Sequence, residues 1–539
     1  MRILTINSTL APYFPDTCQV KNLDLSGGIV DLSKIREVKE FNPDLIFQQE
    51  NLGPRTLLLG FSEFHCKKVF WSIDTHLNFF WHKIYGKNFD LLLTTQPSFV
   101  SLFKKENISS DCLMWYGLPL NWNAWESRKY SIGFAGRVNE YRTLRKALVD
   151  FLKKEFSSHF VHQELPFTQM LNFYQQTKIV VNEAIAGEIN FRTFEALSCG
   201  CLLFSPGLKE DLREFFEPEK EYYVEYRDGL ELKEKLHYFL NHPQEASLIA
   251  RRGWEKLRAN HLAPARVQKL LALTQNLEVK KTLAVEEKSR VIASFFLLKE
   301  NNNFPEEDKD LENILLAGYK NAEIYCCLLE LNLQHRNKLE EILYYLLKKG
   351  LYEENWELNL CASFAALFWK NRELARKFIV RYVKSNSLYK DIPKKIRDMI
   401  LFWAKELIRR KQKFRIGFLF DPNKHLPRSA AECLYLLLLN NPADEEALKL
   451  LKTLLREQKG VEDKLLQLES QLSLLHPEDW RLGLDLAETN LKNFRIQEAR
   501  EEFLLAWQKA REQKKEQEFW LRVKGKRGIA RLVPGGRYA

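Results

Sequence analysis

Short apolar runs alternate with amphipathic stretches from the first residue to about residue 275. The runs are four to seven residues long, and several are almost continuously apolar, which is typical of strands covered by helices on both faces. A first series comprises Arg2–Asn7, Val20–Leu25, Asp44–Gln48, Lys68–Ile73, Leu91–Thr95 and Cys112–Tyr116, and a second comprises Tyr130–Ala135, Ile179–Glu183, Leu202–Ser205 and Tyr222–Tyr226.

The stretches between the runs have helical spacing, for example Leu32–Glu40, Pro97–Glu106 and Asn190–Cys199, the last closed by Gly200 as a C-terminal cap. Strands that alternate with helices predict a parallel, doubly wound sheet. We therefore expect an α/β region of two Rossmann-like domains, over residues 1–122 and 123–275.

Beyond residue 276 the pattern is helical, and nine of the 22 glycines lie there. We expect a helical linker over 276–310 and an α-helical domain over 311–539. The segment from Pro477 to Ala506 places small and large apolar residues at the offsets of a tetratricopeptide repeat, which it resembles. Asn440–Asp444 with Ala447 looks like the start of another repeat. An irregular helical domain is the alternative interpretation.

Composition narrows the function classes. The longest apolar run, Cys433–Leu439, has seven residues, far short of the roughly 20 that a membrane-spanning helix needs. Nine scattered cysteines without a CxxC motif predict reduced thiols in a cytoplasmic protein, with no zinc site and no disulfide framework. The net charge of +11 fits an anionic ligand without identifying it.

The most informative segment runs from the strand end at Asn182 through a loop to a helix that opens near Asn190. The first turn of a helix concentrates unpaired N–H groups and positive potential, which favour phosphate. Arg192 can add a bidentate contact to that phosphate, and Glu195, one turn further, can accept hydrogen bonds from ribose hydroxyls. The alternatives are a solvated Arg192 and a Glu195 that stabilises the helix dipole.

The stretch Asn190–Gly200 resembles the N-x-R-x-F-E-A-x-x-x-G signature of GT-B glycosyltransferases, and most of all the spore-maturation-type glycosyltransferase-like group within the glycosyl transferases group 1. Ile132–Arg137 resembles the strand and loop that open the C-terminal half in that group. The resemblance covers about residues 130–275.

This resemblance implies a nucleotide-diphospho-sugar donor bound by the second Rossmann half. By matching positions, Glu195 would hold the ribose, Arg192, Gly136 and Arg137 would meet the diphosphate, and Asn182 and Asn190 would line the donor pocket. The resemblance also implies no cofactor and no bound metal, and consistently no Asp-x-Asp follows a strand; Asp308 and Asp310 fall in the linker. The sequence departs from the pattern at Gly187, where retaining members often carry an acid.

In the first half, Asp74 and His76 follow the strand end at Ile73. Ligands in such folds lie at the carboxyl ends of parallel strands, so either side chain could act as general base on an acceptor hydroxyl. The alternative is an aspartate that caps the next helix with a histidine packed beneath it. Glu50, after another strand, is a weaker candidate.

The sequence therefore predicts a cytoplasmic, metal-independent, hexosyltransferase-like glycosyltransferase. Its helical repeats would recruit a protein or glycan acceptor, and no nucleic acid is expected. A non-catalytic scaffold that binds nucleotide or carbohydrate and a nucleotide-sugar epimerase remain alternatives. Leu77–Tyr85 or the basic tail could contact a membrane surface peripherally; the alternatives are a core-facing helix and a solvated tail. The cations of the tail are Lys524, Lys526, Arg527, Arg531 and Arg537.

Overall fold

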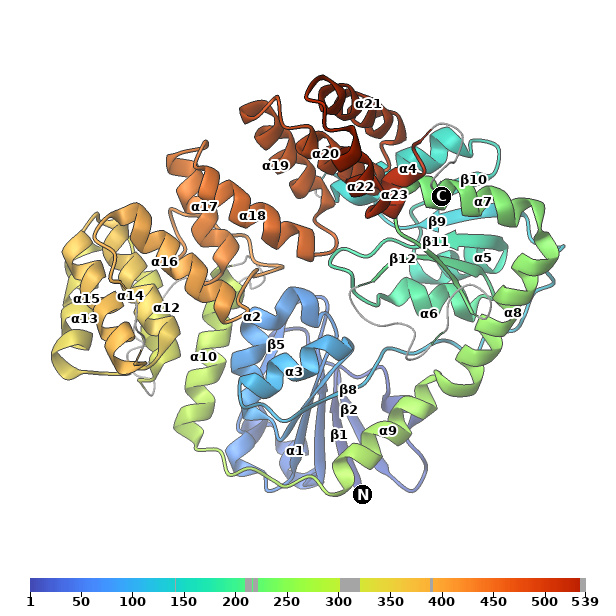
Figure 1. Ribbon diagram of the computed structural model, residues 1–539. Coiled ribbons are helices and arrows are strands. Elements are labelled where there is room, and N and C mark those ends of the chain that lie inside the picture. Colours follow the sequence, from blue (N-terminus) through green and yellow to red (C-terminus); the bar gives the residue numbers. More distant parts are fainter. Residues whose placement is uncertain (141, 209–215, 217–221, 301–319, 388–390, 534–539) are drawn as a thin grey trace. The chain divides into compact units, whose positions relative to one another are not determined.

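A computed structural model of the chain describes residues 1–140, 142–208, 216, 222–300, 320–387 and 391–533 (Figure 1). The chain divides into two compact units. The first comprises Met1–Met114 with Val267–Ala447, and the second comprises Trp115–Arg266 with Leu448–Ala539. Each unit therefore joins one α/β domain to part of the helical region, and each is described separately below.

The first unit contains a six-stranded, fully parallel sheet. Its strands β4, β6 and β7 are almost wholly buried, which explains their continuously apolar sequences. From edge to edge the order is β2 (Gln19–Leu23), β1 (Arg2–Ile6), β4 (Leu45–Gln49), β6 (Lys67–Ser72), β7 (Leu91–Thr94) and β8 (Ser110–Cys112). A separate parallel pair joins β3 (Gly28–Asp31) to β5 (Thr56–Leu59). The connecting helices are α1 (Arg36–Phe41), α2 (Thr75–Tyr85) and α3 (Pro97–Lys105).

Helix α10 (Ala284–Glu300) packs against α2 and β5 of the same unit. The Glu287 carboxylate accepts hydrogen bonds from the backbone N–H groups of Phe61 (2.9 Å) and Ser62 (3.1 Å). The further helices of the unit are α12 (Ala322–Leu331), α13 (Arg336–Lys349), α14 (Trp356–Phe368), α15 (Arg372–Ser385), α16 (Ile396–Arg409) and α17 (Ala430–Asn440). An ion pair between Lys83 of α2 and Glu357 of α14, 3.2 Å apart, ties these helices to the α/β domain.

The second unit contains a five-stranded parallel sheet. Its order is β10 (Phe160–Gln163), β9 (Tyr130–Ala135), β11 (Thr177–Val181), β12 (Leu202–Pro206) and β13 (Val224–Tyr226). Its helices are α4 (Thr143–Glu155), α5 (Phe167–Gln175), α6 (Phe191–Ser198), α7 (Gly229–Asn241) and α8 (Pro243–Asn260). Gly200 adopts a left-handed conformation (φ +69°) after α6, which confirms the predicted cap.

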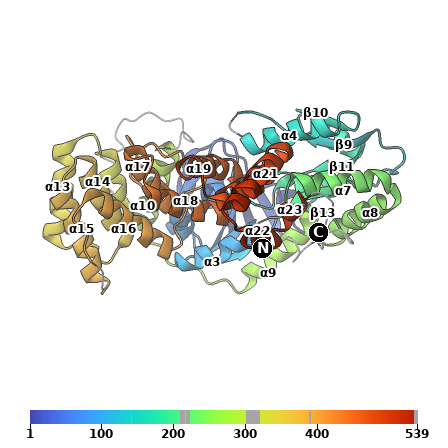
Figure 2. The same cartoon turned by 45° about the horizontal axis from the view of Figure 1, so that its top comes forward.

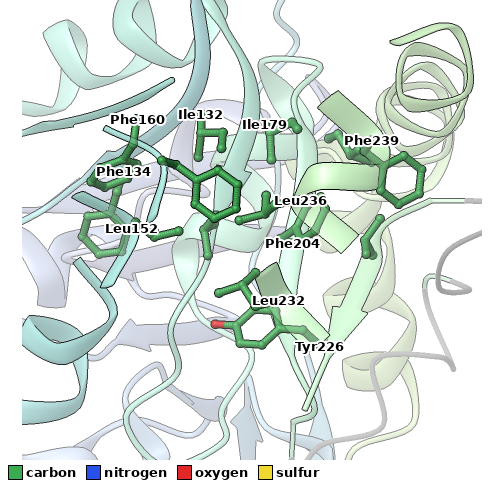
Figure 3. Close-up of a cluster of buried hydrophobic side chains, with 14 of the residues drawn as sticks. Ile132, Phe134, Leu152, Phe160, Ile179, Phe204, Tyr226, Leu232, Leu236 and Phe239 are labelled. Carbon is green, nitrogen blue, oxygen red and sulfur yellow. The ribbon is translucent and has the colours of Figure 1, made fainter. Parts of the chain in front are cut away.

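The core of this sheet forms where the apolar faces of α4 and α7 cover β9, β11 and β12 (Figure 3). Each apolar side chain buried in this core contributes roughly 2 kcal/mol to the stability of the folded state by leaving water. The labelled members are Ile132, Phe134, Leu152, Phe160, Ile179, Phe204, Tyr226, Leu232, Leu236 and Phe239. The strand ends that carry the candidate donor residues are therefore fixed by a closely packed core.

The second unit also contains α19 (Glu462–Leu475), α20 (Trp480–Lys492), α21 (Ile496–Glu512), α22 (Glu516–Lys524) and α23 (Arg527–Ala530). Helices α20 and α21 form the hairpin expected from the small residues of this segment. A Cβ on Gly483 would lie 3.0 Å from the Cβ of Ala506, so the glycine permits close approach. Leu230 of α7 belongs to the same core cluster as this hairpin, so the helices share a core with the second α/β domain.

The predicted fold class is confirmed: two Rossmann-like domains with parallel sheets precede a helical region. The boundary between the units falls within α9 (Ala263–Gln275) and α18 (Glu445–Glu457), so each α/β domain shares its unit with helices from beyond residue 276. The four-part division at residues 122, 275 and 310 and the tetratricopeptide-like character of the repeats stay predictions.

Candidate functional site

The candidate donor site lies at the carboxyl ends of β9 and β11 and at the start of α6. Strand β9 ends at Ala135, and Gly136 follows with φ +145°, a conformation that favours glycine. A Cβ on Gly136 would come within 3.0 Å of Nη2 of Arg192. The absence of a side chain at Gly136 therefore allows the loop to close on the Arg192 guanidinium.

Arg192 is buried and is held on three sides. Its Nε donates to the hydroxyl of Tyr174 (3.2 Å), its Nη1 to Oδ1 of Asn182 (3.1 Å) and its Nη2 to the carbonyl of Ala135 (2.9 Å). Burial alone would lower the pKa of Arg192, but Tyr174 and Glu183 nearby raise it above its ordinary value. The guanidinium is therefore a fixed positive charge, and one N–H on each terminal nitrogen remains beyond these three bonds.

A second buried arginine, which the sequence analysis missed, lies beside the first. Nε and Nη2 of Arg145 both lie 2.8 Å from Oε2 of Glu183. Burial lowers the pKa of Arg145, and Glu183 opposes that shift. Arg145 occupies a position of α4 where the helical period calls for an apolar residue, in register with Leu148 and Leu152. A charged residue at an apolar position of the helical pattern is the sequence signal that could have identified Arg145.

Asn182 and Asn190 form the link between the strand end and the helix. The Asn190 amide donates to Oδ1 of Asn182 (3.0 Å) and to the carbonyl of Glu183 (2.8 Å). Within the described ranges, three buried polar atoms here have no hydrogen-bond partner: Nδ2 of Asn182, Oδ1 of Asn190 and Oγ1 of Thr193. Unpaired buried polar atoms are costly, so each of these three atoms can gain by bonding to a ligand or a water molecule.

Glu195 lies half-buried on α6, one turn beyond Arg192. Burial raises the pKa of Glu195, and Arg192 only partly opposes that shift. In the part of the chain that the structure describes, no side chain bonds to its carboxylate. The carboxylate is thus available to accept hydrogen bonds from vicinal hydroxyls of a ligand.

Arg137 is the member of the predicted donor set that stays outside this network. Its side chain is exposed, and only its backbone carbonyl takes part, as the acceptor of a 3.4 Å bond from Nη1 of Arg145. The structure thus brings together Gly136, Asn182, Asn190 and Arg192, with Glu195 next to them.

The carboxyl ends of β11, β12 and β13 are covered by the chain's own C-terminal helices. A small cavity of about 50 Å³ remains between these strand ends and two turns that connect C-terminal helices, at 458–462 and at 492–494. We call the first of these turns the Gly460 turn. Gly460 has φ +76°, and a Cβ there would lie 1.5 Å from the carbonyl oxygen of Ile185. The Gly460 turn therefore rests directly on the loop between β11 and α6.

In the first unit, Asp74 occupies the N-cap position of α2 but makes no side-chain cap bond to the helix. His76 is buried, and burial lowers its pKa. Its Nδ1 has no hydrogen-bond partner among the described residues. The aromatic side chains Phe80, Trp81 and Tyr85 of this helix are buried too, so Leu77–Tyr85 is a core-facing helix rather than a membrane-binding face.

Glu50 is the most heavily bonded carboxylate at this sheet edge. It accepts hydrogen bonds from the backbone N–H groups of Ile73 (2.7 Å) and Asp74 (2.9 Å) and from Nδ2 of Asn78 (2.8 Å). Burial would raise the pKa of Glu50, but His82 and Arg55 outweigh it and lower the pKa to about 2. Glu50 therefore fixes the end of β6 and the start of α2.

The structure also bears on the expectations about membrane spans, disulfides and metal ligands. No helix in the described ranges is long and apolar enough to span a bilayer. None of the nine cysteines, all of which lie in the described part of the chain, forms a disulfide. Among the residues that the structure describes, no three potential metal ligands cluster, and metal independence stays a prediction. Asp308, Asp310 and Arg537 lie outside the described residues.

Residues 134–272 match a family model described as glycosyl transferase-like, which covers most of the second α/β domain. The resemblance to glycosyltransferases is thus confirmed for this segment, while the spore-maturation-type subgroup stays a prediction. No curated protein matches the sequence.

Several solved structures resemble the chain at low identity. A sucrose-phosphate synthase from Thermosynechococcus elongatus is 12% identical over 51% of this chain and 98% of its own, with a TM-score of 0.39. A glycosyltransferase from Rickettsia africae is 11% identical over 51% of this chain and 98% of its own, with a TM-score of 0.37. HepE from Anabaena, solved in complex with UDP-glucose, is 11% identical over 51% of this chain and all of its own, with a TM-score of 0.36.

Proposed function

We propose that the protein is a glycosyltransferase that takes a sugar from a nucleotide-diphospho-sugar donor. The observation that carries this proposal is the Arg192 network, because a fixed cation, a helix start and unpaired buried polar atoms meet at one strand edge. The network lies inside the segment that matches the glycosyl transferase-like model. In this assignment Glu195 accepts bonds from the ribose, and Arg192 and the N–H groups that begin α6 bind the diphosphate.

The same groups would assist the chemical step. Breaking the bond between the sugar and the diphosphate develops negative charge on the leaving phosphate. Arg192 carries its positive charge in place before the reaction, so it stabilises that charge without having to reorganise. Arg145 is held beside Arg192 by its ion pair with Glu183, so the net positive charge at this edge comes from Arg192. Transfer by this route needs no bound metal.

Deprotonation of the acceptor hydroxyl is assigned to His76 or Asp74. The lowered pKa of His76 keeps its imidazole neutral near pH 7, which is the form that accepts a proton. His76→Ala and Asp74→Asn should then lower kcat more than donor affinity. Full activity in both variants would move the base elsewhere.

The acceptor is proposed to be a protein or a glycan held by the helical region. On α13, Tyr344 and Tyr345 are adjacent and exposed, and aromatic rings of this kind pack on sugar rings and peptide surfaces. Tyr344→Ser with Tyr345→Ser should lower transfer to the acceptor while donor hydrolysis is unchanged. Equal loss of both activities would contradict this role.

The direct test is a screen of the full chain for hydrolysis and transfer with uridine, guanosine and adenosine diphosphate sugars, hexose donors included. We expect turnover of at least one donor, with the same rate after EDTA treatment. Loss of activity in EDTA would contradict metal independence. Absence of both turnover and binding for every donor would contradict the proposal as a whole.

A non-catalytic nucleotide-binding scaffold is the second candidate, and the Gly460 turn favours it. The cavity that this turn leaves over the strand ends holds little more than a few water molecules. Nucleotide binding without hydrolysis or transfer of any donor would support the scaffold.

A further inference from the structure

A groove lined by basic side chains opens beside the strand-end cavity in the second unit. Its volume is about 770 Å³, and its walls come from the end of β13, the start of α7 and helices α20, α22 and α23. Figures 1 and 2 both show α23 next to α7. The charged lining, which we call the basic groove, comprises the cations Arg227, Lys459, Lys492, Lys524, Lys526 and Arg531 and the acids Asp228, Glu231 and Glu488.

Ion pairs hold the two walls of the basic groove together. Arg531 of the tail lies 2.5 Å from Oδ2 of Asp228, whose other oxygen caps α7 by accepting from the N–H of Glu231. A Cβ on Gly528 would come 3.0 Å from the same Asp228 carboxylate, so the tail approaches this carboxylate closely at Gly528. The tail cation Arg531 is therefore a built-in part of this wall rather than a solvated charge.

The acidic residues of the groove are already neutralised. Asp228 pairs with Arg531, Glu231 with Lys235 (3.2 Å) and Glu488 with Lys492 (2.9 Å). Lys526 also pairs with Glu488.

Two cations of the lining remain without such a partner. Arg227 and Lys459 are exposed, and within the described ranges neither side chain has an ion-pair or hydrogen-bond partner. They come from different walls, Arg227 from the end of β13 and Lys459 from the Gly460 turn. Arg227 and Lys459 thus present positive charge from two walls, and part of the Lys459 charge acts on Glu462, whose pKa burial raises and Lys459 partly lowers.

The size and position of the groove fit a small ligand. Small-molecule sites have volumes of about 300–1,000 Å³, and ligands of α/β sheets lie at the carboxyl ends of strands. The basic groove and the strand-end cavity share Arg227, Asp228, Lys459 and Lys492 in their linings. A ligand in the groove would therefore reach the edge of the sheet that carries the candidate donor site.

We propose that the basic groove binds a phosphate-bearing small molecule, with Arg227 and Lys459 as its main contacts and Lys492 at the junction with the cavity. The ligand is either the diphosphate of a donor nucleotide, which would then reach from the Arg192 network into the groove, or free pyrophosphate. The nucleotide source rests on the proposed function, whereas the pyrophosphate source does not. All the residues that bind lie outside the motif from Asn190 to Gly200, and Lys459 and Lys492 lie beyond the segment that matches the family model.

The test is calorimetry on the full chain with inorganic pyrophosphate and, separately, with UDP, GDP and ADP. Arg227→Ala and Lys459→Ala should each weaken binding of the phosphate-bearing ligand about tenfold, and the double variant more, because each removes a charge-assisted contact. Lys153→Ala is the matched control, since Lys153 is exposed on α4 and lies outside the groove lining. This control should bind like the wild type.

Glu195→Ala distinguishes the two sources. If pyrophosphate binding falls in the groove variants and no nucleotide binds at all, the groove proposal stands and the proposed function fails. If nucleotide binding falls with Glu195→Ala but neither nucleotide nor pyrophosphate binding falls in the groove variants, the groove proposal is overturned while the proposed function stands. Absence of binding by pyrophosphate and by every nucleotide overturns the groove proposal, as does an equal loss in Lys153→Ala.

Discussion

The two parallel sheets present opposite chemistry at their carboxyl edges. In the first unit, the Glu50 carboxylate accepts bonds from two backbone N–H groups and one amide, and it lies near His82 and Arg55. In the second unit, the Glu195 carboxylate has no bonded side chain within the described ranges, and three nearby polar atoms are buried without partners. We name the edges after these two carboxylates: at the saturated edge Glu50 holds strand and helix together, although Nδ1 of His76 there has no partner in the described ranges, and at the unsaturated edge Glu195 has bonding capacity left for a ligand.

The pKa shifts of the two carboxyls follow the same division. Burial favours the protonated form of both, but Glu50 has the His82 ring and the Arg55 guanidinium beside it and bonds to backbone N–H groups, and its pKa is lowered to about 2. Glu195 has Arg192 alone, and its pKa stays raised. The difference between these two pKa values follows from their neighbours, since buried carboxylates that are fully bonded, such as Glu287, also have raised pKa values.

The largest expected effect is on stability at the saturated edge. Glu50→Ala should lower the free energy of unfolding by about 3–5 kcal/mol, because it leaves buried donors and a buried charge unpaired. Denaturant unfolding of this variant is the measurement, with the exposed Glu40→Ala as its control. A loss below about 1 kcal/mol would show that the bonds to Glu50 are not what holds this edge.

The next effect is on nucleotide affinity at the unsaturated edge. Arg192→Lys should weaken nucleotide binding by about tenfold or more. The compact ammonium of lysine cannot replace a planar guanidinium that bonds to Asn182 and Ala135 and still has N–H groups left for a ligand. Arg137→Ala should change affinity much less, since that side chain is exposed and outside the network. Calorimetry on both variants decides: if Arg137→Ala loses more affinity than Arg192→Lys, the network is not the diphosphate site.

Gly460→Ala tests whether the C-terminal helices close the unsaturated edge. The added Cβ cannot fit against the carbonyl of Ile185, so the Gly460 turn should shift away from the loop beneath it. We expect faster hydrogen exchange of the amides in 184–190, by mass spectrometry. Gly350→Ala is the control, because Gly350 also has a left-handed φ (+60°) but meets only a glutamate side chain. Equal exchange in wild type and Gly460→Ala would show that the turn does not cover the loop.

The smallest effect is on the pH dependence of stability. The pKa of Glu195 is higher in the folded state than its unfolded value near 4.5, so protonation of Glu195 stabilises the fold. This stabilisation is complete below pH 4.5 and is lost as the pH rises through the folded pKa. Glu195→Gln should therefore be slightly more stable than the wild type at pH 7, with a difference that vanishes as the pH falls to 4.5. Glu50 acts in the opposite sense, since its contribution is lost as the pH falls from 4.5 towards 2. A difference for Glu195→Gln that grows on acidification would contradict these signs.

Much of the fold was predictable because buried strands have continuously apolar sequences. β9 coincides with the predicted Tyr130–Ala135, whereas Cys112–Tyr116 overlaps the actual β8 only at Cys112. Strands β3, β5 and β10 were not predicted, since β3 and β10 are short and largely half-exposed and β5 is only four residues long. Which helices pack on which sheet depends on tertiary contacts that periodicity does not contain.

The candidate site was predictable where a helix start and a motif coincide, as at Asn190, Arg192 and Glu195. Arg145 was missed because an arginine on a helix is normally solvated, and only its place on the apolar face sets it apart. The Gly460 turn lies far along the chain from the strands it covers, and no local pattern connects the two. Long-range closure of a site is the part that a single sequence does not reveal.

The decisive experiment on the donor site compares the nucleotide affinity of Glu195→Ala with that of the wild type, by calorimetry with the best-binding nucleoside diphosphate. We expect a loss of about tenfold with an unfolding transition like that of the wild type, because the carboxylate bonds to ligand and to no side chain in the described chain. Unchanged affinity in a folded Glu195→Ala protein would contradict the assignment of the unsaturated edge as the donor site.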